Sequence, residues 1–134
     1  MKSSFNHLQI NIDPKNLSFY KDLMTFLGWS VIFEAEGMAG FKSGSNGDIW
    51  FLKSPKMDQS NSDNIGLSHI AFKVESMKDV VDLVSYLKSN NVDSLYDTPR
   101  HRPEFAASEQ DTYYQVLFES PDKVLFEVMY VGKK

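Results

Sequence analysis

Two histidines and one glutamate are the residues whose types and placement point most directly to chemistry. His7 lies in FNHLQINID, His69 lies in the similar segment LSHIAFKVE, and Glu127 lies in the apolar segment VLFEVMY. Two imidazoles and one carboxylate on separate strands are the ligand set of a divalent metal site with open coordination positions. These three residues therefore predict a metalloenzyme.

A structural role is the alternative interpretation of these residues. A single histidine on an apolar strand is more often a satisfied structural residue than a ligand, but the matching positions of His7 and His69 favour a metal site. Glu127 points inward if Leu125 and Met129 do, and an unpaired buried carboxylate is costly. It is solvated instead if the other side of the strand forms the core, namely Phe126, Val128 and Tyr130.

Further charged residues gather in a long segment between two predicted strands of the second half. Within residues 98–105, Arg100 or Arg102 could clamp a carboxylate or phosphate, and His101 or Glu104 could transfer a proton. Long loops between strands often carry function. The alternative is a solvated loop bracketed by prolines.

Two adjacent tyrosines begin the strand that follows. Strand alternation sends either Tyr113 or Tyr114 inward. The inward hydroxyl could reach a substrate at the metal, or it could bond to the backbone only. Both tyrosines are therefore catalytic candidates.

The elements that must position these residues repeat once along the chain. Hydrophobic periodicity predicts a helix over 19–27 and strands at 5–13, 29–34, 37–42 and 48–53, with Asn46-Gly47 as a turn signal. After a polar linker the order restarts, with a helix over 76–90 and strands at 67–74, 92–96, 113–119 and 124–131. Residues 97–111 are expected to be irregular. The predicted fold class is α+β, a single domain of two tandem βαβββ units, at 5–54 and 66–131, joined by the linker 55–65.

The repeat can be tested by residue register. His7 falls on His69 at an offset of 62, and the terminal hairpins match at an offset of 77, which puts Trp50 on Glu127. A symmetric four-ligand site would need a carboxylate at position 50, and an indole cannot bind a metal. Trp50 is expected in the core or in a pocket wall, where it offers a stacking surface to a substrate.

Composition narrows the classes of function. A chain of 134 residues with 42% hydrophobic residues is expected to bury a core of its own. The net charge of −4 without a basic block argues against nucleic acid, and no apolar leader or span indicates a membrane, so a cytoplasmic protein with a small-molecule substrate is expected. Cysteine is absent, so a metal would have to be held by nitrogen and oxygen.

Several of these features together resemble the vicinal oxygen chelate superfamily over residues 5–131. They are the paired βαβββ units, FYKD and LGW after the first histidine strand, LSHIAFKV, and the closing YY…FESPD…FEV. This superfamily includes glyoxalase I, extradiol dioxygenases, fosfomycin-resistance transferases, methylmalonyl-CoA epimerase and bleomycin-resistance proteins, and the chain looks most similar to small bacterial glyoxalase-like members. The resemblance implies that each unit curls into an incomplete barrel and that both enclose one cleft and one metal. The matching ligand positions are His7, Trp50, His69 and Glu127.

Two functions of different classes follow from the resemblance. The first is a metal-dependent enzyme in which Fe, Mn, Zn, Ni or Co acts as a Lewis acid on a substrate chelated through adjacent oxygens, as a lyase or isomerase, a dioxygenase or a thiol transferase. Trp50 argues against glyoxalase I chemistry, which uses a residue at that position. The second is a metal-free protein that sequesters a ligand or drug, of the bleomycin-resistance type. The family commonly dimerises and sheet edges invite pairing, so a homodimer is expected.

Overall fold

The same order of elements occurs twice along the chain, once in each of two compact units. The computed structural model describes residues 1–45 and 47–134, and its two units are Met1–Gln59 and Ser60–Lys134. Their boundary falls inside the predicted linker 55–65. The predicted turn at Asn46-Gly47 includes a residue outside the described ones.

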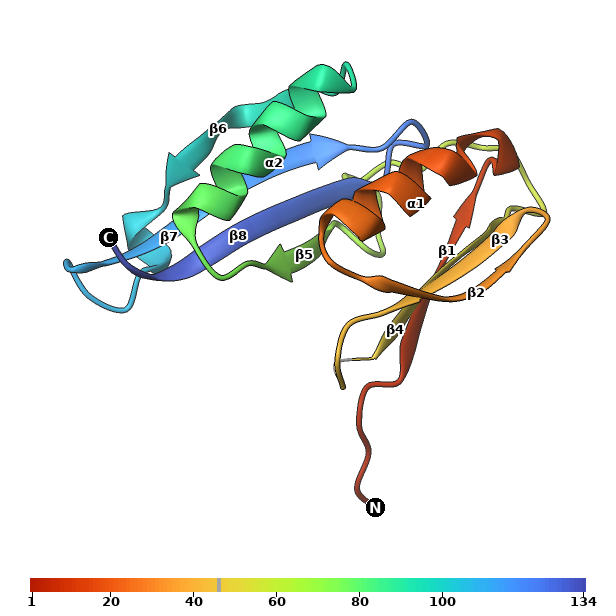
Figure 1. Cartoon of the computed structure of the whole chain (residues 1–134), viewed down its shortest axis with the longest axis horizontal. Helices are drawn as coiled ribbons and strands as arrows, with labels where there is room; N and C mark the ends of the chain where they lie inside the picture. Colours follow the sequence, from red (N-terminus) through yellow and green to blue (C-terminus); the bar gives the residue numbers. More distant parts are fainter. Residues whose placement is uncertain (46) are drawn as a thin grey trace. The chain divides into compact units, whose positions relative to one another are not determined.

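The first unit is a four-stranded sheet with one α-helix on one of its faces (Figure 1). The strands lie in the order β1-β4-β3-β2, with β1 parallel to β4 and the other pairs antiparallel. The elements are β1 (His7–Ile12), the short helix η1 (Pro14–Asn16), α1 (Leu17–Phe26), β2 (Ser30–Ala35), β3 (Met38–Lys42) and β4 (Asp48–Lys53).

The second unit repeats this topology, with the strand order β5-β8-β7-β6 and β5 parallel to β8. Its elements are β5 (Ile70–Lys73), α2 (Met77–Ser89), β6 (Ser94–His101), the short helix η2 (Pro103–Phe105), β7 (Asp111–Glu119) and β8 (Leu125–Lys133). The predicted α+β fold of two tandem βαβββ units is confirmed.

Strand pairing also supports the predicted register of the repeat. Gln9 lies beside Trp50 in the β1–β4 ladder, and Ala71 lies beside Glu127 in the β5–β8 ladder. The offsets of 62 and 77 residues carry the first pair onto the second. Trp50 and Glu127 therefore occupy equivalent places in the two sheets.

Each unit buries the apolar side of its helix against one face of its own sheet. In the first unit Tyr20 of α1 stacks on Phe51 with ring centroids 4.4 Å apart. In the second, α2 begins at a capping box of Ser76 and Asp79 and lies across its sheet (Figure 1), burying Val80, Leu83 and Leu87. Alternation along the strands sends Trp50 and Glu127 to the opposite faces. Neither these helices nor any other described helix is long and apolar enough to cross a membrane.

The strand β6 departs from the sequence prediction. Residues 97–101 were expected to be irregular, which is wrong, because β6 resumes its pairing with β7 after a bulge and ends at His101. In the bulge, the Oγ1 of Thr98 donates to the carbonyl of Leu95 and accepts from the N–H of Leu117, at 2.6 and 3.0 Å. A side chain thus replaces backbone ladder bonds. Pro99 is tolerated because β6 is an edge strand.

Candidate metal and substrate site

Glu127 is a buried carboxylate on a strand whose two faces are both covered. Phe126 and Val128 lie on the helix side of β8 and are fully buried, while Glu127 projects to the other side and is only 5% exposed. The alternative in which Phe126 and Val128 form the core is therefore right, but its corollary that Glu127 is solvated is wrong. A carboxylate in such a place requires partners.

One oxygen of Glu127 faces His69. The histidine immediately precedes β5, and because Ala71 pairs with Glu127, His69 lies two residues along on the same face. Its Nε2 is 3.1 Å from Oε2 of Glu127, and its side chain is 39% exposed. The other ring nitrogen, Nδ1, lies 3.2 Å from the hydroxyl of Ser68. The structure thus brings two of the three predicted metal ligands together.

The other oxygen of Glu127 accepts two hydrogen bonds from β7. The Tyr113 hydroxyl donates to Oε1 at 2.6 Å. With the Gln115 amide oriented so that its oxygen faces Arg102, its nitrogen donates to the same oxygen at 3.0 Å. Burial raises the pKa of Tyr113 above its ordinary value, and the hydrogen bond to Glu127 raises it further. The tyrosine is therefore a protonated donor throughout the neutral range.

Tyr113 is the member of the tyrosine pair that reaches the carboxylate. Tyr114 projects to the opposite face of β7, where its ring lies 4.7 Å from that of His101. His101 also meets Thr112 there, with its Nδ1 2.5 Å from the threonine hydroxyl. The two candidates His101 and Tyr114 thus lie together, on the side of the sheet away from Glu127.

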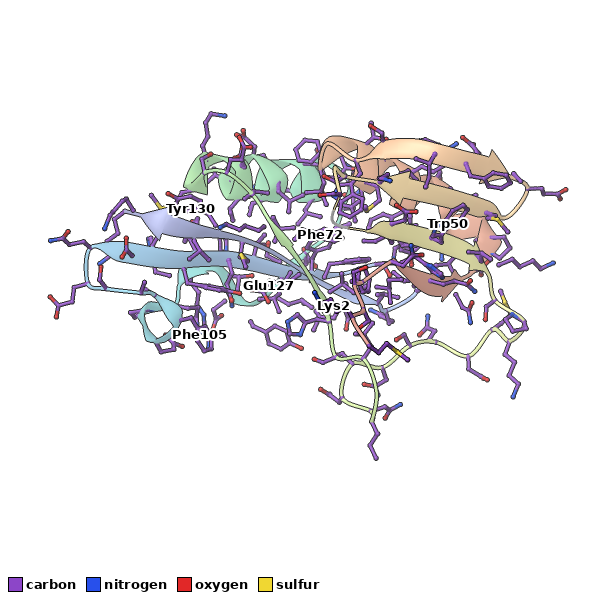
Figure 2. All side chains as sticks on the ribbon, turned by 90° about the horizontal axis from the view of Figure 1, so that it is seen from below. Lys2, Trp50, Phe72, Phe105, Glu127 and Tyr130 are labelled. Carbon is purple, nitrogen blue, oxygen red and sulfur yellow. The ribbon has the colours of Figure 1, made fainter. Side chains whose placement is uncertain are left out.

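Arg102 extends the network beyond β7. Its Nη1 donates to the side-chain oxygen of Gln115 at 3.1 Å, and its Nε donates to Glu104 at 2.5 Å. The guanidinium also lies over the ring of Phe105, 4.7 Å from the centroid. The hydrogen bond from Arg102 lowers the pKa of Glu104, which keeps that carboxylate ionised and paired. Figure 2 shows Phe105 on the short segment beyond β6 and Glu127 on β8.

The bulge in β6 decides which of its residues share the face of Glu127. Leu95 pairs with Leu117 before the bulge, and Arg100 pairs with Gln115 after it. The chain thus advances five residues along β6 but only two along β7, which is a shift of three residues. A shift of three residues is odd and reverses the face to which each later side chain points. Arg100 consequently lies on the face of Gln115, exposed to solvent.

Gln115 is the functional candidate that sequence reasoning missed. It is a polar residue two positions after Tyr113, and the residues that follow it as far as Phe118 are apolar. Strand alternation alone puts it on the same face as Tyr113 and Leu117. Leu117 pairs with Glu127, so Gln115, two residues before Leu117, lies on the same face and next to that pair. This polar residue in an apolar stretch was the signal in the sequence.

The equivalent face of the first unit carries His7 and Trp50. His7 is exposed, with its Nδ1 2.7 Å from the Asn6 side-chain oxygen. The indole of Trp50 lies flat on Gly40, where a Cβ would come within 2.8 Å of the ring. The ring of Phe33 lies 5.8 Å from it. This face therefore offers an imidazole and an aromatic surface, and no carboxylate at the position of Glu127.

The donor atoms of His69 and Glu127 suit a divalent metal ion. Ligand nitrogen and oxygen atoms lie about 2.0–2.2 Å from such an ion, so two neighbouring ligands are separated by roughly 2.9–3.4 Å. The observed separation of 3.1 Å falls in that range. Within residues 1–45 and 47–134, no cluster of three His, Cys, Asp or Glu side chains is assembled. His7, the third predicted ligand, belongs to the first unit.

Comparison with known proteins bears on the fold. No protein-family model and no curated protein matches the sequence. Among solved structures, a candidate glyoxalase from Bacillus halodurans superposes with a TM-score of 0.77, 23% identity and 93% coverage of both chains. A glyoxalase/dioxygenase from Nostoc punctiforme gives a TM-score of 0.72 at 17% identity, over 96% of this chain and 90% of that one.

A third similar structure contains a metal. It is the fosfomycin resistance protein FosX from Listeria monocytogenes, complexed with Mn(II) and sulfate, with a TM-score of 0.68 and 18% identity over 97% of this chain and 91% of that one. Identities this low establish the architecture. The chain has the fold of these glyoxalase, glyoxalase/dioxygenase and fosfomycin-resistance structures.

Proposed function

We propose that the chain is a metal-dependent enzyme acting on a small substrate that binds through two adjacent oxygens. The observation that carries the proposal is the pair His69 and Glu127, whose donor atoms are 3.1 Å apart in a fold shared with the Mn(II)-bound FosX protein. His7 occupies the equivalent position at the start of the first sheet, and its role as the third ligand stays a prediction from the sequence.

A bound divalent ion, whether Fe, Mn, Zn, Ni or Co, would supply Lewis acidity for negative charge that develops on the substrate. The protein residues would prepare the site for it. Tyr113 and Gln115 hold one oxygen of Glu127, so the buried carboxylate keeps a fixed orientation. Tyr113 also remains a neutral hydroxyl near that carboxylate.

A substrate would contact accessible side chains that are not engaged in the hydrogen bonds around Glu127. Arg102 is engaged by Gln115, Glu104 and Phe105, whereas Arg100 is exposed on the face of Gln115. Arg100 is therefore the better candidate to bind an anionic group of a substrate. Trp50 presents an indole suited to stacking on a flat or apolar group.

The subtype of the reaction is limited by Trp50. Enzymes of the glyoxalase I type use a metal-site residue at this position, and an indole supplies none. A three-ligand set leaves more coordination positions open, as in non-haem oxygenases. We therefore favour dioxygenase-type or thiol-transferase-type chemistry over isomerisation.

Metal content tests the proposal directly. Protein purified without chelator, then offered Fe, Mn, Zn, Ni or Co, should bind one equivalent of at least one metal, and His69→Ala should lose that binding. His101→Ala is the matched control, because His101 lies on the opposite face of the same sheet. Wild-type protein that binds none of these metals would support instead the ligand-sequestering function.

We also propose that the protein is a homodimer. The strand β2 lies at the edge of its sheet, and its apolar residues Val31, Ile32 and Phe33 are 44–47% exposed. Exposed apolar edge strands favour pairing. Sedimentation of wild type and of Ile32→Lys would test this, and a wild-type monomer at micromolar concentration would refute it.

A further inference from the structure

The two carboxylate oxygens of Glu127 have different neighbours: polar side chains of β7 bind Oε1, and His69 faces Oε2. We propose that Tyr113, Gln115 and Arg102 are positioning residues that reserve Oε2 of Glu127 for a metal ion by occupying Oε1. This inference rests on the proposed function, since it assumes that Glu127 is a ligand. It assigns roles to residues that are not ligands themselves.

The hydrogen bonds to Oε1 are the first step of the argument. A carboxylate oxygen has two lone pairs suited to hydrogen bonding, and Oε1 accepts from the Tyr113 hydroxyl at 2.6 Å and from Gln115 at 3.0 Å. Both lone pairs are thereby used. Oε2 faces the imidazole of His69 at 3.1 Å. An ion next to His69 would consequently meet one carboxylate oxygen and not two.

Arg102 fixes the direction in which Gln115 donates. A guanidinium has only donors, so the side-chain oxygen of Gln115 must face Arg102, and the amide nitrogen then faces Glu127. The reversed amide would aim its oxygen at the carboxylate and its N–H groups at the guanidinium. Arg102 is itself held by the ion pair with Glu104 and by the ring of Phe105. The order of donors and acceptors from Glu104 to Glu127 is therefore determined.

This arrangement has a consequence for coordination. Carboxylates bind metals through one oxygen or two, and the second mode would occupy a position that a chelating substrate needs. With Oε1 held by Tyr113 and Gln115, Glu127 would give one atom to an ion and leave the neighbouring position to the substrate. If Oε1 were released, the carboxylate could turn and occupy that position.

A purely packing role for Tyr113 is the competing explanation. Its ring meets that of Phe105 at 5.5 Å in an edge-to-face contact, and Tyr113→Phe keeps this contact while it removes the hydroxyl. Packing alone would then leave metal binding unchanged. The coordination of a spectroscopic ion distinguishes the two roles.

The experiment is Co(II) titration of wild type, Tyr113→Phe and Tyr114→Phe, followed by the visible absorption of the ion. Tyr114 is the matched control, because it is adjacent and projects to the opposite face. We expect Tyr113→Phe to weaken Co(II) affinity by about 10- to 100-fold and to shift the visible absorption bands of the bound ion, because the coordination mode of Glu127 changes. Tyr114→Phe should match wild type in both respects.

A second variant keeps the test decisive if Tyr113→Phe folds poorly. Gln115→Met preserves the side-chain length and removes the donor, so it should change the spectrum in the same direction. Wild-type affinity and spectrum in both variants would overturn the inference while leaving the proposed function intact. Failure of the wild type to bind Co(II) would overturn both proposals.

Discussion

The corresponding faces of the two units have the same backbone and opposite chemistry. Trp50 and Glu127 occupy equivalent positions in ladders of the same register, yet the first is an indole lying on Gly40 and the second a carboxylate held by Tyr113 and Gln115. The repeated fold supplies positions, and the side chains at those positions decide which unit presents a carboxylate as a candidate metal ligand. The candidate site is therefore asymmetric although the fold is nearly symmetric.

The second strands of the units differ in a related way. β2 has a register shift of one residue between Val31 and Phe33, whereas β6 shifts by three residues between Leu95 and Arg100. Both shifts are odd, so both reverse the later side chains. The larger bulge takes up three residues of β6, so His101 pairs with Tyr114, and Arg102 lies opposite Tyr113 and reaches Gln115. The polar network thus depends on an insertion that the first unit lacks.

The largest expected effect follows from removing the charge that distinguishes the second unit. Glu127→Gln keeps the shape of the side chain but makes it a weak ligand, so we expect metal affinity to fall more than about 100-fold, beyond the loss usual for residues around the ligands. Calorimetric titration with Mn(II) measures it. Glu119→Gln on the same hairpin is the control, and equal affinities in the two variants would exclude Glu127 as a ligand.

The first unit is best perturbed beneath its indole. At Gly40 a Cβ would lie 2.8 Å from the Trp50 ring, so Gly40→Ala forces the indole away and should destabilise the protein by about 1–3 kcal/mol. Denaturant unfolding measures the free energy.

A double-mutant cycle with Trp50→Ala supplies the control. If the indole is the cause, Gly40→Ala should lose most of its effect in the Trp50→Ala background. An unchanged effect would mean that Gly40 is needed for another reason, and the contrast between indole and carboxylate would no longer explain the glycine.

The larger bulge, in β6, can be tested by substituting Thr98. Thr98→Val is nearly isosteric and leaves the buried N–H of Leu117 without its acceptor, which should destabilise the protein by about 1–2 kcal/mol. Hydrogen exchange at Leu117 should accelerate, while exchange in α1 of the first unit should follow only the global change. Unaltered protection of Leu117 would show that the bulge does not depend on the hydroxyl.

The sequence predicted the parts of this molecule that depend on local periodicity. Alternating strands and helical stripes are properties of residues close together in the chain. The offset of 77 residues between Trp50 and Glu127 follows from comparing two such local patterns, and strand pairing agrees with it. The bulge in β6 was missed because it depends on Thr98 bonding to Leu117, nineteen residues away. The prolines at 99 and 103 made the same residues look like a loop.

The sequence identified the ionisable residues of the candidate site but only part of its neutral hydrogen-bond partners. Buried carboxylates and paired histidines are rare enough in strands to be noticed, so His69 and Glu127 were identified from the sequence. The choice between Tyr113 and Tyr114 required the phase of β7 against β8, and the orientation of Gln115 required Arg102. A neutral hydrogen-bond donor such as Gln115 can be recognised only after the position of the carboxylate that it binds is known.

The smallest expected effect is a pH dependence of stability, which tests the hydrogen bond between Tyr113 and Glu127 in protein without metal. Burial, followed by the hydrogen bond to Glu127, raises the pKa of Tyr113, so the unfolded chain loses this proton at lower pH than the folded one. The stabilisation is present in full below the ordinary tyrosine pKa and declines as pH rises towards the folded-state value. Metal-free wild type should therefore lose stability relative to Tyr113→Phe above about pH 10. Urea unfolding of both proteins across that range measures the difference, and a constant difference would mean that the tyrosine hydroxyl is no better protonated in the folded protein than in water.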